Sequence, residues 1–227
     1  MVSHGQPSDP DPAEAALASI APDLPGWRVK TATLAKPQAL ESALADAGSD
    51  PVIYPMFMTD GWFVQSALPK RLQQVPGATI LPPLGVDPDL PDVVAEALKA
   101  ELARRGWQAA ETTLLVAAHG SGRSPNSARD TVQFVDRLTG VIGFEKIHIG
   151  YVEQPPHLDD VTVLCPPQSI SLPFFAADGG HVQDDIHDAL ESSGFSGVRM
   201  APVGLLPGVR ELMARAISRA AAAPGTG

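Results

Sequence analysis

The chain has 227 residues, and its 26 acidic against 16 basic side chains give a formal net charge of −10. This balance, without any cluster of lysines and arginines, argues against a protein that binds nucleic acid. The 44% of apolar residues argues against a disordered chain, and a single cysteine, Cys165, excludes an internal disulfide framework. The sequence has no secretory signal pattern and no apolar run suited to a bilayer. We therefore expect a cytoplasmic protein with no membrane or nucleic-acid partner.

The two halves of the chain repeat one another in three short segments that occur in the same order. Because three pairs at nearly one spacing are hard to obtain by chance, the sequence predicts two copies of one domain. Gly106 follows two arginines, a pattern typical of a helix end, and divides the chain into domains at 1–106 and 107–227. The pairs, with spacings of 115, 118 and 119 residues, are 2–10 with 117–125, 54–64 with 172–182, and 81–85 with 200–204.

Each copy alternates strand-like and helix-like stretches. Short apolar runs that end in glycine-rich sequence indicate buried parallel strands, and apolar residues three to four apart indicate helices. Strands separated by helices form right-handed βαβ units, so we expect an α/β protein whose domains are doubly wound parallel sheets. The expected strands are 28–33, 52–57, 79–81, 112–118, 146–152, 170–175 and 197–201, and the expected helices are 91–105, 126–138, 183–190 and 208–222.

Three side chains of the second copy follow directly on predicted strands. His119 follows immediately on the run at 112–118, His181 follows a pair of glycines and opens a helix, and Glu153 lies just past the strand at 146–152. Ligands of open α/β sheets bind beyond the carboxyl ends of the strands. Two imidazoles and one carboxylate suit a divalent first-row ion with open positions for substrate. Each residue also has a purely structural interpretation, as a turn, a cap or a solvated loop carboxylate.

Other motifs fit less well. Gly120 and Gly122 lack the third glycine of a dinucleotide-binding loop. A nucleophile elbow at Ser121 would need glycines two residues to either side, where His119 and Arg123 stand. The acidic pair at 184–185 is expected to complement the dipole of the helix that His181 opens.

His119-Gly120-Ser121 at a strand end, together with the segment at 172–182, resembles the class II chelatases, in particular the CbiX/SirB sirohydrochlorin chelatase group. The resemblance implies two tandem flavodoxin-like domains, each with a sheet of about four strands. It also implies a lyase that inserts a divalent metal, Co²⁺ first and otherwise Fe²⁺ or Ni²⁺, into sirohydrochlorin or a related tetrapyrrole. That reaction belongs to cobalamin or siroheme biosynthesis. The metal is then a substrate, no organic cofactor is expected, and the protein acts as a monomer or a homodimer.

Carried over residue by residue, the resemblance makes His119 and His181 the catalytic histidines that handle the metal. Glu153 matches an acidic residue that some relatives add. The loops around the histidines leave room for a flat macrocycle, and an arginine could pair with its carboxylates. The residues expected to contact the substrate are Ser121, Arg123, Gly179 and Gly180, with Arg129 as a second candidate arginine.

The first copy departs from this pattern. His4 is retained, but Phe63 stands where the second histidine would be, Gln6 replaces the serine, and nothing matches the glutamate. We therefore expect a degenerate site in the first half and a working site in the second. Two other interpretations stay open: a carrier that binds metal or tetrapyrrole without turnover, and a relative without a site whose degenerate half serves a partner interface.

Overall fold

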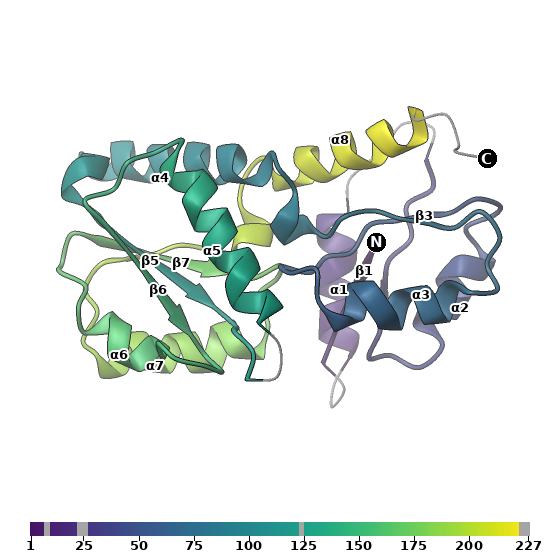
Figure 1. Cartoon of the computed structure of the whole chain (residues 1–227), viewed down its shortest axis with the longest axis horizontal. Helices are drawn as coiled ribbons and strands as arrows, with labels where there is room; N and C mark the ends of the chain where they lie inside the picture. Colours follow the sequence, from purple (N-terminus) through teal and green to yellow (C-terminus); the bar gives the residue numbers. More distant parts are fainter. Residues whose placement is uncertain (7–9, 22–26, 123–124, 223–227) are drawn as a thin grey trace.

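The computed structural model describes residues 1–6, 10–21, 27–122 and 125–222. It is an α/β structure in which every strand pairing is parallel (Figure 1). The strands are β1 Val2–Ser3, β2 Ala32–Thr33, β3 Val52–Ile53, β4 Thr79–Ile80, β5 Thr113–Ala118, β6 Lys146–Tyr151, β7 Ser169–Phe174 and β8 Val198–Arg199. The α-helices are α1 Asp11–Ile20, α2 Ala39–Ala45, α3 Leu68–Leu72, α4 Leu90–Arg105, α5 Asn126–Thr139, α6 Leu158–Thr162, α7 His187–Ser192 and α8 Val209–Ala222. None of the described helices is long and apolar enough to cross a membrane.

The two halves have the same strand order. In the second half the sheet runs β6-β5-β7-β8. In the first half, the pairs β1-β2 and β3-β4 are joined by a parallel bridge between Val2 and Pro55, which gives the order β2-β1-β3-β4. The strands of the first half are only two residues long, so the strands expected at 28–33 and 52–57 are too long. Pro51 and Pro55 bracket β3 and lack the N–H groups that a longer ladder needs.

The second sheet is covered by helices on both faces. Leu114, Val116 and Ala118 of β5 belong to one hydrophobic core, with residues of α4, α5 and α8. Leu115 and Ala117 point to the other face and pack against residues of α6 and α7. This alternation is the two-residue period of a strand buried on both sides, and Figure 1 shows α4 and α5 on one side of the sheet and α6 and α7 on the other.

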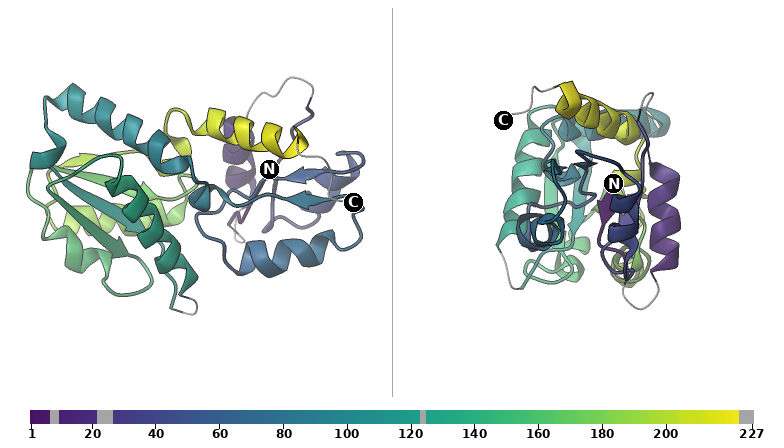
Figure 2. Two further views of the ribbon diagram at one scale, coloured as in Figure 1. Left: turned by 45° about the horizontal axis from the view of Figure 1, so that its top comes forward. Right: turned by 90° about the vertical axis from the view of Figure 1, so that its right-hand side faces the viewer.

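The last helix of each half packs with elements of the other half. Helix α4, which ends the first half in sequence, contacts α5 of the second half, and α8 contacts β3 of the first half. Figures 1 and 2 show α8, in yellow, lying over the first half. An ion pair between Arg219 of α8 and Asp89, directly before α4, joins the crossing helices at 2.9 Å. The division into 1–106 and 107–227 therefore describes the sequence repeat, and it stays a prediction as a division into folding units.

The repeat also recurs in local geometry. Gly85 donates its N–H to Phe57 O at 3.0 Å, and Gly204 donates to Phe175 O at 2.9 Å. A Cβ at either glycine would lie 2.0 Å from a backbone oxygen, that of Met58 or of Ala176 respectively. Both positions therefore require glycine because the two backbones touch.

We expect Gly204→Ala to destabilise the fold strongly, because the backbone of Ala176 would have to move to admit the methyl group. The expected loss in the free energy of unfolding is about 2 kcal/mol or more. Gly143→Ala is the matched control, since no described atom lies within 4 Å of a Cβ at that position. Urea unfolding of both variants measures the difference, and equal stabilities would contradict the close contact.

Candidate metal centre

Two histidines that are 62 residues apart in sequence meet at one edge of the second sheet. His119 follows β5 directly, and His181 comes after β7, at the start of a π-helical segment over Val182–Ile186. Because β5 and β7 are adjacent parallel strands, their carboxyl ends lie at the same edge. The two Nε2 atoms are 3.1 Å apart, and the rings meet edge to face with their centroids separated by 4.4 Å.

Glu153 completes the group. It follows β6, the other neighbour of β5, and its N–H donates to His119 O at 2.9 Å. One ligand atom each from His119, Glu153 and His181 lies within 4.8 Å of the others, and this is the one such group that could hold a metal among the described residues. The three side chains that the sequence singles out are therefore brought together. Glu153 is exposed and His119 and His181 are half-buried, so the site is open to solvent.

In each histidine, the hydrogen bond made by Nδ1 determines whether Nε2 carries a proton. His119 Nδ1 lies 2.9 Å from Gly120 O, and His181 Nδ1 lies 2.8 Å from Asp185 Oδ2. A carbonyl and a carboxylate only accept hydrogen bonds, so each Nδ1 carries the proton. In the neutral rings two unprotonated Nε2 atoms then lie 3.1 Å apart, and the repulsion between their lone pairs is unfavourable unless a cation binds to both.

The distance between the Nε2 atoms suits a metal ion. With metal–nitrogen bonds of about 2.0–2.1 Å, two neighbouring ligands of one first-row ion are roughly 3.0–3.4 Å apart. The observed 3.1 Å falls in this range. A proton shared between the two nitrogens would also relieve the repulsion, and an entering metal ion would displace it. The arrangement can therefore hold a divalent ion and exchange it with protons.

Asp185 is a contact that the sequence reasoning missed. The pair at 184–185 is expected there to complement a helix dipole, whereas the structure gives Asp185 a direct hydrogen bond to His181 Nδ1. The spacing of four residues between His181 and Asp185 is the signal that could have found it. In a helical segment this spacing places two side chains on one face.

The residues expected to contact the substrate lie in the loops that follow His119 and precede His181. The N–H of Ser121 donates to Gln154 Oε1 at 2.7 Å, which holds the loop after His119. Gly179 O accepts the N–H groups of Val182 and Gln183 and so starts the π-helical segment. Gly180 lies between Gly179 and His181. Arg123 lies outside the described residues.

Arg129, the second arginine considered, is engaged within the protein. It forms an ion pair at 3.0 Å with Asp130, whose side chain is 3% exposed. Asp130 Oδ2 also accepts the N–H of Asp60 at 2.9 Å, and Asn126 Nδ2 donates to Asp60 O at 3.3 Å. These bonds hold a loop of the first half against the first turn of α5, close in sequence to the His119 loop.

The first half contains the same geometry without the ligands. His4 Nδ1 contacts Gly5 O, as His119 Nδ1 contacts Gly120 O. The ring of Phe63 meets that of His4 edge to face with centroids 4.5 Å apart, the place that His181 takes in the second half. Ala35 donates its N–H to His4 O at 2.8 Å, as Glu153 does to His119 O at 2.9 Å, so an alanine replaces the glutamate.

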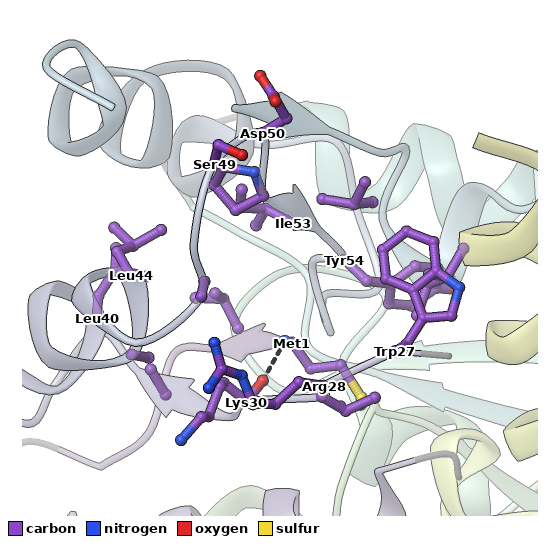
Figure 3. Close-up of a pocket in the computed structure, with 18 residues that line it drawn as sticks. Met1, Trp27, Arg28, Lys30, Leu40, Leu44, Ser49, Asp50, Ile53 and Tyr54 are labelled. Atoms are coloured by element: carbon purple, nitrogen blue, oxygen red, sulfur yellow. Dashed lines mark hydrogen bonds between the residues drawn. The ribbon is translucent and has the colours of Figure 1, made fainter. Parts of the chain in front are cut away.

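A cavity lined mainly by residues of the first half lies away from these histidines. It has a volume of about 280 Å³ and is lined by residues at the start of β1, β2 and β3, with Leu40 and Leu44 of α2 (Figure 3). The nitrogen of Met1 donates to Lys30 O across it at 2.6 Å. The histidines instead follow the carboxyl ends of strands in the second half, so this cavity is separate from the metal centre.

Comparisons with known proteins show which proteins this chain resembles. A family model described as CbiX matches residues 113–222, the half that carries the histidines. A relative from Halobacterium salinarum, named as a probable sirohydrochlorin cobaltochelatase, is 22% identical over 211 residues, 81% of this chain and 72% of the relative. The structure of SirB from Bacillus subtilis with Fe³⁺ matches with a TM-score of 0.75, over 97% of this chain and 94% of that one. Its 14% identity shows a shared fold.

A solved structure of CbiX is much more similar in sequence. It is described as the terminal enzyme for the biosynthesis of siroheme in denitrifying bacteria, and it is 40% identical to this chain. The match covers 96% of this chain and 97% of that one, with a TM-score of 0.84. The resemblance seen in the sequence and the α/β chelatase-like fold with parallel sheets are thereby confirmed. This protein belongs to the CbiX family.

Proposed function

We propose that this protein is a chelatase that inserts a divalent metal ion into sirohydrochlorin. The single observation that carries the proposal is the pair of Nε2 atoms 3.1 Å apart, with both Nδ1 atoms occupied by acceptors. The names of the relatives support it, since the CbiX structure belongs to siroheme biosynthesis and the Halobacterium relative is named as a cobaltochelatase. Chelatases of this kind are lyases.

The reaction needs a site that binds the ion and then releases it. When the metal enters the macrocycle, two pyrrole N–H protons leave, so a neutral base must be present near the metal. His119 and His181 supply two neutral nitrogens. As the ion moves from the protein to the macrocycle, one of these nitrogens takes one pyrrole proton, and the second proton passes to the solvent to which the site is open. The open, half-exposed histidine pair permits this transfer, whereas a closed cage of four ligands would retain the metal. Glu153 balances the charge of the ion.

We propose Co²⁺ as the first choice of metal, with Fe²⁺ and Ni²⁺ as the alternatives. Two imidazoles and a carboxylate suit any of these ions, because affinity for first-row metals changes smoothly along the series. SirB of Bacillus subtilis has been solved with Fe³⁺ and in complex with cobalt, which supports cobalt and iron as the first candidates. The net charge of −10 favours the approach of cations in general.

The same proposal assigns different roles to the two halves. The second half, as a flavodoxin-like unit with strand order β6-β5-β7-β8, carries the reacting groups. The first half repeats that order and keeps His4, but Phe63 and Ala35 stand where ligands would be needed. We propose that the first half is a degenerate flavodoxin-like copy and that one site per chain turns over, in a monomer or a homodimer.

The test is a turnover assay with sirohydrochlorin and Co²⁺, Fe²⁺ or Ni²⁺ in separate reactions, followed by the absorption of the macrocycle. We expect many metal insertions per protein chain, above the spontaneous rate, with at least one of the ions. A carrier would give a change that stops at one equivalent of protein. A protein with neither role would leave the spontaneous rate unchanged and would show no bound metal in a titration.

A further inference from the structure

Asp185 forms a hydrogen bond with His181, and His181 is the histidine of the pair whose Nδ1 contacts a side chain rather than the backbone. Its Oδ2 lies 2.8 Å from His181 Nδ1, and it stands four residues ahead in the π-helical segment. His119 is held differently, because its Nδ1 contacts the carbonyl of Gly120, the next residue in the chain. The orientation of His119 is thus fixed by the backbone, whereas the orientation of His181 depends on a single removable carboxylate.

The geometry points to Asp185 as a positioning residue for the metal-handling histidine His181. The carboxylate accepts the Nδ1–H hydrogen bond, which fixes the tautomer with a free Nε2 lone pair and holds that nitrogen 3.1 Å from His119 Nε2. A carboxylate behind a metal-binding imidazole also makes the ring a better ligand. This inference rests on the proposed function, since it specifies how the same metal site is kept ready.

Among the described residues, Asp185 has no ion-pair partner other than His181 that would explain its presence. In the described part of the chain, no lysine or arginine forms an ion pair with it, and the one ion pair recorded for this carboxylate is with His181. Its side chain is 48% exposed, so burial does not require it either. A carboxylate in such a place contributes little to the stability of the fold, and its effect should be on the imidazole.

The first half provides an internal comparison. With the spacing of 118 residues that relates Phe63 to His181, the residue equivalent to Asp185 is Ala67. The equivalents of His181 and Asp185 are therefore both absent from the degenerate copy, where Phe63 packs on His4 instead. The two residues behave as a unit, present together in one half and replaced together in the other.

The experiment measures Co²⁺ binding alone, by the visible absorption of the bound ion, in the full-length protein and its variants. We expect Asp185→Ala to weaken Co²⁺ binding by about 10- to 100-fold. Asp185→Asn keeps an acceptor but loses the charge and should have a smaller effect, and Asp185→Glu should recover part of the loss. The matched control is Asp184→Asn, which changes the same charge one residue away and should bind Co²⁺ as the unmodified protein does.

A second readout separates positioning from general structural damage. Long-range ¹H–¹⁵N correlation spectra of the metal-free protein should show His181 with its proton on Nδ1, and a mixture of tautomers in Asp185→Ala. Unchanged thermal unfolding of that variant would show that the fold is intact. The inference is overturned if Asp185→Ala binds Co²⁺ as tightly as Asp184→Asn, or if its tautomer is unchanged. If the unmodified protein fails to bind Co²⁺ at all, the proposed metal site itself is wrong.

Discussion

Replacing His119 with alanine is expected to abolish metal insertion while leaving the fold intact. The variant removes one of the two Nε2 atoms that face each other at 3.1 Å, and with it both a metal ligand and a neutral base. Loss of a positioned base alone costs a factor of about 100 to 10,000 in rate, so we expect kcat to fall at least about 100-fold. His181→Ala should give a loss of similar size, because neither nitrogen can hold the ion alone.

The measurement is the turnover assay with sirohydrochlorin, run beside circular dichroism to verify folding. His157→Ala is the matched control, since that exposed histidine lies before α6 and outside the metal group. It should retain full activity. Near-normal turnover by His119→Ala would remove both histidines from the mechanism, whatever the similarity to other chelatases.

A second metal site should appear in the first half when its three missing side chains are restored. His4 is in place, and the changes Ala35→Glu, Phe63→His and Ala67→Asp supply the equivalents of Glu153, His181 and Asp185. The substituted positions have matching local geometry, as the ring contacts of 4.5 and 4.4 Å and the N–H bonds of 2.8 and 2.9 Å show. We expect the number of bound Co²⁺ ions per chain to rise from one to two.

Equilibrium dialysis with Co²⁺ measures this stoichiometry directly. Repeating it in a chain that also carries His119→Ala isolates the new site, which should then hold a single ion. Phe63→His alone should bind more weakly than the triple variant, because the imidazole would lack the carboxylates around it. A triple variant that folds normally and still binds one ion would mean that the equivalence of the two halves ends at the backbone.

Much of the local structure could be predicted from the sequence. The strands expected at 112–118, 146–152 and 170–175 agree with β5, β6 and β7 to within one residue at each end, and the helix expected at 91–105 agrees equally well with α4. These segments have strong periodic patterns and clear ends. The strands expected at 28–33 and 52–57 are much shorter in the structure, and at 52–57 the reason is that Pro51 and Pro55 lack the N–H groups a longer ladder needs.

The amino-acid sequence by itself predicted two copies of one domain. It determined that the first half lacks the counterparts of one histidine and of Glu153, and that His119, Glu153 and His181 follow strand-like stretches. Those features are local and need only residue types and spacings. Only the tertiary structure decided that β5 lies between β6 and β7, which brings three distant side chains within 4.8 Å of one another. It also decided that α4 and α8 pack across the halves and that Asp185 holds His181. The order of the strands and the packing of α4 and α8 across the halves depend on which buried surfaces meet. Contacts between residues far apart in sequence leave no periodic pattern along the chain from which they could be predicted.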